Sequence, residues 1–264
     1  GGDETGEDGE RPETYVPDDA GMTRSGVTLS VLAAAHSTEV TALSVRARWT
    51  EPGRGFYWSF REEPPYLRDE HGNTYEQVSR PGVPGVVKVV ADPQATPPPG
   101  GYTEDTTLTF EPVPLGTRRL TLVVPALGFE QQAKKTVALD LGSAPEFGQM
   151  WSLEQLWTIA GHSVRVTGVR LTHGETEDLP YRLVFEMEVE QDGEGTLLEG
   201  LLLEPEGLPI NSYGSESGNY SGDGTLNPVL HLPALPDRPF TVSTAPGVSL
   251  VIVGPWEVTW EVPD

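Results

Sequence analysis

Short segments in which every second residue is apolar recur along this chain, and this period of two constrains the fold more than any other feature. It is clearest in residues 27–31, 43–49 and 181–189, where apolar residues alternate with mostly polar or charged ones. Side chains on a β-strand point alternately to opposite faces, so the pattern predicts strands with one buried and one solvated face. Further strands are predicted at 108–110, 120–124, 137–141, 163–171, 197–203, 240–243 and 248–253.

Glycine and proline interrupt these segments throughout. The chain of 264 residues holds 30 glycines and 25 prolines, well above the typical combined share of roughly 12%. This composition excludes long helices, because both residues disfavour helix interiors. No apolar run approaches the roughly 20 residues that a membrane helix needs. We therefore expect an all-β protein, in which the Pro- and Gly-rich residues 81–101 form a long excursion around one strand.

Acidic residues outnumber basic ones and are unevenly distributed. The formal net charge is −23, from 17 Lys and Arg against 40 Asp and Glu. Residues 1–20 carry a net −7, residues 21–140 a net −1 and residues 141–264 a net −15. The first stretch is almost devoid of apolar residues, so residues 1–22 are expected to form an acidic flexible tether.

The rest of the chain is expected to form two tandem immunoglobulin-like β-sandwich domains. The first would cover residues 23–142 and the second residues 161–264. Between them, residues 143–160 predict a linker with a short helix, because MWSLEQLW spaces its apolar residues as a helix does. A strand that opens the second domain is the alternative. Trp256 and Trp260 face the same side of the last strand and are expected to be core residues.

The two halves resemble an internal duplication. Gly72 and Gly207 each close a strand with a turn, and PLGTRRLTLVV at 114–124 is similar to LPDRPFTVS at 235–243. In the same way TVALDL at 136–141 is similar to WEVTWEV at 256–262, with nearly the same offset along the chain. Chance similarity between amphipathic strands is the alternative explanation.

Several functional classes lack the residues that they need. With 17 scattered Lys and Arg, no basic stripe can neutralise phosphates, so nucleic acid is excluded as an expected partner. The absence of cysteine excludes disulfides, thiolate metal sites and thiol nucleophiles. Neither a nucleophile-elbow nor a phosphate-loop motif is present, and we expect no enzymatic activity. The lone histidines are interpreted as surface residues: His36, His71, His162, His173 and His231.

Turn and strand motifs carry a resemblance to a known group of proteins. They are D-x-x-G-N-x-Y at 69–75, F-x-P-x-P at 110–114, the following L-T-L-x-V-P, and G-P-W-x-V-x-W-x-V-P at 254–263. Together they resemble the extracytoplasmic β-sandwich regions of bacterial anti-sigma-factor-like proteins and related surface proteins of unassigned function. The resemblance covers about 240 residues and implies tandem immunoglobulin-like folds outside the membrane, with no catalytic residues. The cytoplasmic anti-sigma module and the membrane helix of that group have no counterpart here.

The amino-terminal residues GGDETGEDGE are similar to the tether that follows the lipid-bearing cysteine of bacterial lipoproteins. An acidic leader behind a membrane helix or signal peptide is the alternative. Both imply an extracytoplasmic protein anchored at the cell envelope. The membrane would then be contacted only through a removed lipid anchor or helix.

Aromatic residues supply the first candidate ligand-binding set. Phe56, Tyr57, Trp58 and Tyr66 lie close together in the sequence, and three consecutive rings on one strand cannot all enter one core. Exposed rings near acids and amides can stack on sugars. The loop 211–224 adds Tyr213 and Tyr220 among small polar residues, a composition typical of recognition loops. Rings that cover a sheet edge and a merely flexible loop are the alternatives.

Acidic turns supply a candidate calcium site. Asp69, Glu70 and Asn73 form one cluster of oxygen ligands, and Asp192 with Glu194 forms another. Neither has the spacing of a known calcium loop, and a solvated acidic surface is the alternative. Apart from this calcium possibility, no cofactor is expected.

These observations favour a non-enzymatic extracytoplasmic binding or sensing ectodomain of a bacterial envelope protein. Its partner would be a protein or an envelope glycan, bound by loops at the ends of the domains or in the groove between them. The alternatives are a carbohydrate-binding module that uses the aromatic residues around Trp58 and a calcium-stabilised surface adhesion domain.

Overall fold

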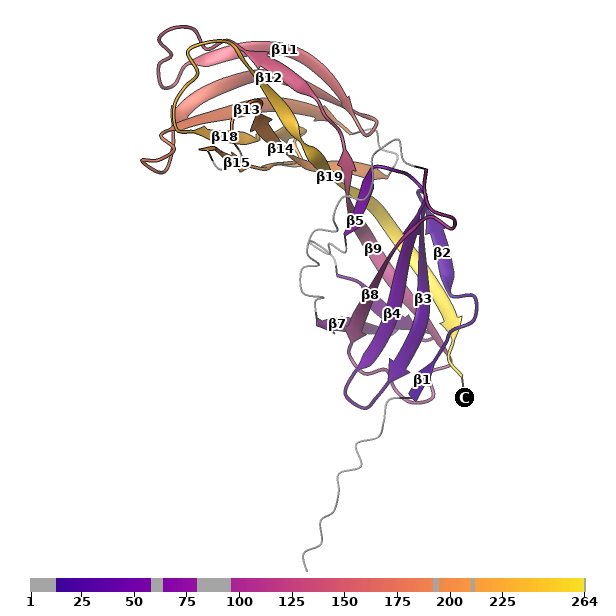
Figure 1. The fold of residues 1–264 in the computed structure, drawn as a ribbon. Helices are drawn as coiled ribbons and strands as arrows, with labels where there is room; N and C mark the ends of the chain where they lie inside the picture. The colour runs from indigo at the N-terminus through magenta and orange to yellow at the C-terminus, as the bar shows by residue number, and fades with distance from the viewer. Residues whose placement is uncertain (1–12, 58–63, 80–95, 192–194, 210–211, 264) are drawn as a thin grey trace, which may run out of the picture.

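The protein is all-β, as predicted (Figure 1). The computed structural model describes residues 13–57, 64–79, 96–191, 195–209 and 212–263. These residues form nineteen strands in two hydrogen-bonded sheets, one of thirteen strands and one of six. They contain no helix that could cross a membrane. Figure 1 shows the strands gathered into two lobes, with β9 and β19 running between them.

The first lobe has two layers of strands. One layer has the order β3-β4-β8-β7, with β1 and β2 both paired to β3. The bounds are β1 Glu13–Tyr15, β2 Gly21–Arg24, β3 Val27–His36, β4 Thr41–Trp49, β7 Thr74–Ser79 and β8 Tyr102–Phe110. β7 connects the two layers, because it pairs with β8 of the first layer and with β6 of the second. The second layer has the order β6-β9-β19. The bounds there are β6 Tyr66–Asp69, β9 Arg119–Gln132 and β19 Phe240–Glu261, with β5 Arg54–Tyr57 paired to β9.

The second lobe repeats this layering. The six-stranded sheet has the order β11-β12-β13-β18-β15, with β17 paired to β13. Its strands are β11 Met150–Ile159, β12 His162–His173, β13 Tyr181–Glu190, β15 Gly214–Glu216, β17 Thr225–Leu226 and β18 Val229–Leu232. The opposite layer contains the first part of β19 together with β10 Thr136–Leu139, β14 Thr196–Pro205 and β16 Gly218–Asn219. Alternating side chains such as Leu183, Phe185 and Met187 are buried between the layers.

The strands β9 and β19 belong to both lobes. Residues 119–124 of β9 pair with 256–261 of β19 beside β6, and residues 126–132 pair with 247–253 beside β14. A register shift between Val253 and Trp256 separates the two ladders. Each lobe therefore completes its second layer with a strand that continues from the other lobe.

This arrangement differs from the expected domain boundary at residue 161. Trp256 and Trp260 are core residues, as predicted, with 0% and 3% of their surface exposed. However, Trp256 donates its indole N–H to the backbone oxygen of Val27, and Trp260 donates to the Tyr15 hydroxyl. The end of the last strand, residues 256–261, thus packs in the first lobe and not in the second. Alternation in a sequence predicts that a strand is buried but not which sheet receives it.

Corresponding strands of the two lobes make the same pairings. The pairs β3·β4, β4·β8, β8·β7 and β6·β9 in the first lobe match β12·β13, β13·β18, β18·β15 and β14·β19 in the second. In the order β16-β14-β19-β9-β6-β7, the corresponding strands β14 and β6 lie on opposite sides of the β19·β9 pair. The pairing of β9 with β19 lies at its centre.

The predicted helical turn in 143–160 is wrong, because residues 150–159 form β11. The alternative, a strand that opens the second domain, is correct. Trp151, Leu153, Trp157 and Ile159 alternate toward the core along this strand, whereas Met150 and Leu156 are 47% and 67% exposed. The helix-like spacing of Met150, Leu153 and Leu156 thus combines exposed and core-facing apolar residues of one strand.

Two smaller expectations also need correction. The tether was expected to extend to residue 22, but residues 13–15 and 21–24 form strands and Ala20 is buried. Residues 1–12 lie outside the described residues. His162 and His231 are not surface residues, since only 0% and 9% of their surfaces are exposed.

Replacing Trp256 with alanine should destabilise the protein by about 3 to 5 kcal/mol, because a fully buried ring and its hydrogen bond to Val27 are both lost. Urea unfolding followed by circular dichroism measures this loss. Trp151→Ala on β11 is the matched control, because that ring is only half-buried, and its loss should be smaller. Equal losses for the two variants would contradict the assigned role of the last strand.

Candidate functional site

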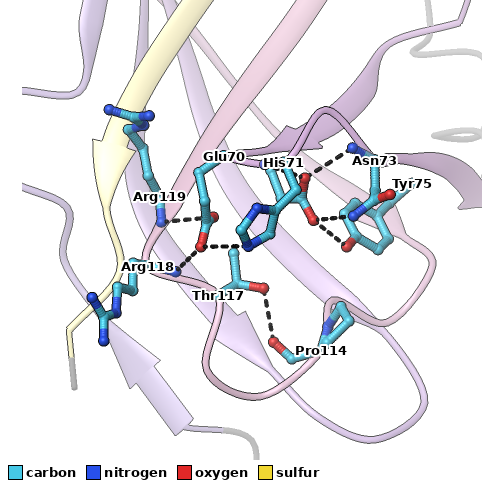
Figure 2. A network of polar contacts seen from close by, with 9 residues as sticks. Glu70, His71, Asn73, Tyr75, Pro114, Thr117, Arg118 and Arg119 are labelled. Carbon is cyan, nitrogen blue, oxygen red and sulfur yellow. Dashed lines mark hydrogen bonds and ion pairs between the residues drawn. The ribbon is translucent and has the colours of Figure 1, made fainter.

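The turn between β6 and β7 is built around the carboxylate of Asp69 (Figure 2). One oxygen of Asp69 accepts hydrogen bonds from the backbone N–H groups of His71 and Asn73, at 2.9 and 2.8 Å. The other accepts from the Asn73 amide at 2.8 Å and from the Tyr75 hydroxyl at 2.9 Å. Gly72 allows the chain to turn here, because its φ of +85° is strained for residues with a side chain. Four donors on one carboxylate make the turn rigid.

These contacts also shift two pKa values. Burial would raise the pKa of Asp69, but the hydrogen bonds from Asn73, Tyr75 and His71 outweigh it and lower this pKa to about 2. Burial, together with the hydrogen bond and the negative charge of Asp69, raises the pKa of Tyr75 to about 12. Asp69 is therefore a structural anion at neutral pH.

Glu70 connects this turn to the loop that precedes β9, residues 111–118. Its two carboxylate oxygens accept the backbone N–H groups of Arg118 and Arg119, at 3.1 and 3.3 Å. The pKa of Glu70 is lowered by its own backbone N–H and by that of Arg118. Figure 2 shows the Arg118 and Arg119 side chains extending away from this carboxylate. Within the described part of the chain, neither guanidinium group forms an ion pair or a hydrogen bond.

Loop 111–118 is held in one conformation at both of its ends. Val113 is buried, and its backbone N–H donates to the hydroxyl of Thr41 at 3.1 Å. Thr117 donates its hydroxyl to the backbone oxygen of Pro114 at 2.9 Å. Between these anchors Leu115 is 88% exposed. The loop therefore presents an apolar side chain to solvent at a defined position.

A hollow of about 420 Å³ lies beside this loop. Apolar groups of Val113, Pro114, Leu115, Val262 and Pro263 line much of it, and Tyr15 and His36 supply polar groups. The Tyr15 hydroxyl lies 3.0 Å from Nε2 of His36, and the two rings stack with centroids 5.5 Å apart. Trp260 donates to the same hydroxyl at 2.8 Å, which ties β1 to the last strand. Burial raises the pKa of Tyr15, although the bond from Trp260 opposes it.

A second hollow of about 430 Å³ adjoins the start of β9 and the Asp69 turn. Arg68, Arg119, Thr121 and Thr259 are among its lining residues. Arg68 pairs with Glu257 at 3.2 Å, and the Thr121 and Thr259 hydroxyls lie 2.9 Å apart. Loop 111–118 with Arg119, the Asp69 turn and these two hollows form what we call the distal site of the first lobe.

The expected calcium ligands behave differently from a metal site. Asp69, Glu70 and Asn73 are brought together, but the oxygens of both carboxylates already accept protein N–H and O–H groups. In the described residues, no group of three or more His, Asp or Glu could hold a metal ion. Asp192 and Glu194 lie outside the described residues.

The residues of the two aromatic candidates that the structure describes lie in different lobes. Phe56 and Tyr57 lie on β5, opposite Phe129 and Gly128 of β9. Half-buried Tyr66 lies on β6 of the first lobe. Half-buried Tyr213 and Tyr220 pack against the core near β15 and β16 of the second lobe. Trp58 lies outside the described residues.

Sequence reasoning named Asp69, Glu70 and Asn73 of the distal site, as calcium ligands, but missed its other residues. Tyr15 was assigned to the tether and His36 to the surface, although the two rings stack and share a hydrogen bond. The segment PVPLGTRR at 112–119 entered the sequence analysis through the internal match and the F-x-P-x-P motif, and not as a candidate site. Its signal is an isolated leucine between proline and glycine, followed by two arginines, which is unusual in a loop that only connects strands.

The low pKa of Asp69 predicts a pH-dependent stability. Because the carboxylate is the form that the fold favours, its contribution is present above about pH 4 and is lost as the pH falls through about 2. Asp69→Asn should lower the free energy of unfolding at pH 7 by about 1 to 3 kcal/mol. The difference from the unmodified protein should shrink between about pH 4 and 2.

Urea unfolding at a series of pH values between 7 and 2 measures this difference. Asp178→Asn is the control, since Asp178 is exposed and has no hydrogen bond or ion pair with another described residue. A difference between Asp69→Asn and the unmodified protein that stays constant down to pH 2 would contradict the assignment.

Comparison with protein-family models, curated proteins and solved structures finds no match to this chain. No activity is therefore transferred to the distal site from a relative. Its chemistry follows from its own residues: a rigid loop with an exposed leucine, two arginines whose side chains pair with no described residue, and a partly apolar hollow with a tyrosine and a histidine.

Proposed function

We propose that the chain is a non-enzymatic binding or sensing protein that holds a protein ligand at the distal site of the first lobe. The observation that carries this proposal is the exposure of Leu115 at 88% on a loop fixed by hydrogen bonds at both ends. A rigid loop loses little conformational entropy on binding, so an exposed apolar side chain on it is suited to recognition. A disordered loop would lose more conformational entropy on binding and would be less suited to recognition.

The adjacent hollow supports the same proposal. Its volume of about 420 Å³ lies within the usual range for ligand pockets, and such pockets combine apolar walls with a few polar groups. Here the polar groups are the Tyr15 hydroxyl and the His36 ring, which hold each other in place at 3.0 Å. An apolar side chain of a partner would fill the hollow and contact Leu115.

The two arginines indicate the charge of the partner. Arg118 lines the same hollow as Leu115, and Arg119 lines the second hollow of the distal site. Arginine is enriched at the energetic centres of protein interfaces. Carboxylates form charge-assisted hydrogen bonds with such groups. The proposed ligand is therefore a protein segment that carries an apolar residue next to Asp or Glu.

We also infer that the lobes are immunoglobulin-like domains that arose by internal duplication. The strand order A-B-E-D opposite C-F-G of that fold is matched by β3-β4-β8-β7 opposite β6-β9-β19. The second lobe follows the same order, with β10 and the end of β9 in place of the last strand. Gly72 and Gly207, the two similar glycines, each follow corresponding strands, β6 and β14.

The proposed location is the outside of a bacterial cell, with the chain anchored at the envelope through a lipid or a membrane helix. The acidic residues 1–12 and the resemblance to anti-sigma-factor-like ectodomains support this location. A distal site at the far end of the first lobe, close to β1, would then lie near the anchored end of the described chain (Figure 1).

A phage-displayed random peptide library selected on the immobilised protein tests the binding proposal. Enriched peptides should contain an apolar residue beside Asp or Glu. Their affinity should fall by about tenfold or more in Leu115→Ser, which removes the apolar contact. A fall of about the same size is expected in the double variant Arg118→Glu/Arg119→Glu, which removes two charged hydrogen-bond donors.

Leu156→Ser and Arg165→Glu serve as matched controls in the second lobe. Both residues are exposed and lie opposite each other on β11 and β12. These variants should bind the peptides as the unmodified protein does. Failure to enrich any peptide, or equal binding by the distal-site variants, would contradict the proposed function.

A further inference from the structure

The outward face of the first lobe carries a polar hollow that the distal site does not include. It has a volume of about 480 Å³ and lies over β3, β4 and β8. Side chains and backbone from Ser30, Leu32, Arg46, Arg48, Gly101 and Thr103 line it.

The alternation of the three strands places these polar residues in two rows. Across the sheet, Ser30 of β3, Arg46 of β4 and Asp105 of β8 are register partners. One step along, Arg48 lies between Thr28 and Thr103. Their neighbours Val45, Ala47 and Trp49 are buried on the opposite face. The outward face therefore carries two arginines on one central strand, with a hydroxyl beside each.

The two arginines differ in what they contact. Arg46 forms a two-pronged ion pair with Asp105, at 2.6 and 2.7 Å, which leaves this pair without net charge. Arg48 is exposed and forms no ion pair or hydrogen bond with any described residue. Among the described residues, the hydroxyls of Ser30 and Thr103 are likewise without a hydrogen-bond partner. The hollow consequently offers one positive charge and two hydroxyls.

Gly101 shapes one wall of the hollow. A side-chain carbon at this position would lie 2.5 Å from the backbone oxygen of Trp49, and its φ is +84°. Only glycine allows the turn before β8 to approach β4 this closely. The backbone N–H of Gly101 donates to Pro98 at 2.9 Å and keeps the turn closed. The closed turn at Gly101 thus forms a rigid wall next to Arg48 and Thr103.

The corresponding strand of the second lobe has the opposite character. β13 makes the same pairings as β4, but its outward face carries Glu186 and Glu188, with Glu186 paired to Arg170 at 2.7 Å. Arg165 of β12 is the register partner of Glu188, so both glutamates face an arginine, and among its described residues this surface offers no arginine without an acidic neighbour, in contrast to Arg48. Because exposed charges are screened over roughly 8 Å at physiological salt, these local charges matter more than the net charge of −23.

We propose that this hollow binds a sugar-sized ligand bearing a carboxylate or phosphoryl group, with Arg48 as the charged contact. A guanidinium group binds either oxyanion through two parallel hydrogen bonds. The hydroxyls of Ser30 and Thr103 complement sugar hydroxyls, and Leu32 offers an apolar contact. The proposal is independent of the distal site, with which this hollow shares no lining residue.

Titrations of the ¹⁵N-labelled protein with glucuronate, glucose 6-phosphate and uncharged glucose, followed by NMR, test the proposal. One or both charged sugars should shift the amide signals of Arg48, Gly101 and Thr103 in a saturable way, and the comparison between them shows which oxyanion the hollow prefers. Glucose should produce no saturable shift. Arg48→Gln should weaken binding by about tenfold or more, since it removes a charge-assisted contact.

Asp105→Asn supplies a test in the opposite direction. It releases Arg46 from its ion pair, so the hollow gains a second available guanidinium group, and binding of the charged sugars should strengthen severalfold. Arg165→Gln is the matched control, because Arg165 is an exposed arginine on β12 of the second lobe. Its binding should equal that of the unmodified protein.

Three results would overturn the proposal: no saturable shift with either charged sugar at 50 mM or about that concentration, equal binding of glucose, or unchanged binding by Arg48→Gln. Since all three substituted side chains are exposed, the unchanged positions of the remaining amide signals establish that each variant is folded. These results do not depend on any peptide binding at Leu115, so they separate this proposal from the proposed function.

Discussion

The antiparallel pairing of β9 with β19 is the interaction on which the rest of the structure depends. Both strands pass from one lobe into the other, so each lobe borrows a strand to complete its second layer. The buried indoles of Trp256 and Trp260 lock the borrowed end of β19 onto Val27 and Tyr15. Separation of the lobes would break a continuous ladder and expose both cores. The lobes are therefore two parts of one cooperative structure and not independently folded domains joined by a linker.

The distal site depends on this arrangement indirectly. β1 is short, and Tyr15 is held there by a hydrogen bond from the last strand and by the ring of His36. On the other side, Glu70 holds the start of β9 through two backbone N–H groups. Loop 111–118 is thus fixed between residues from the beginning, the middle and the end of the chain. The acidic side chain of Glu70, which the sequence suggested as a metal ligand, instead holds the end of loop 111–118 in place.

Sequence reasoning succeeded where one residue and its neighbours determine the outcome. The alternation in 27–31, 43–49 and 181–189 predicted strands, and each of these segments is one. It failed where the answer depends on distant residues. The partner of Trp260 is Tyr15, 245 positions away, and no local pattern encodes that contact. Exposed Met150 and Leu156 gave β11 the apolar spacing of a helix, and Tyr15 lies next to an acidic segment. The distal site was missed for the same reason, since its residues meet only after folding.

The return of β19 to the first lobe has a consequence for how the protein is made. During synthesis, β3, β4 and β8 leave the ribosome long before residues 256–261, so the first lobe cannot complete its core until those residues have emerged. The second lobe has all of its strands once residue 253 has emerged. The nascent chain thus completes its later half before its earlier half. Contacts between such distant residues favour slow folding, and the unfinished first lobe would be the species that chaperones and proteases meet.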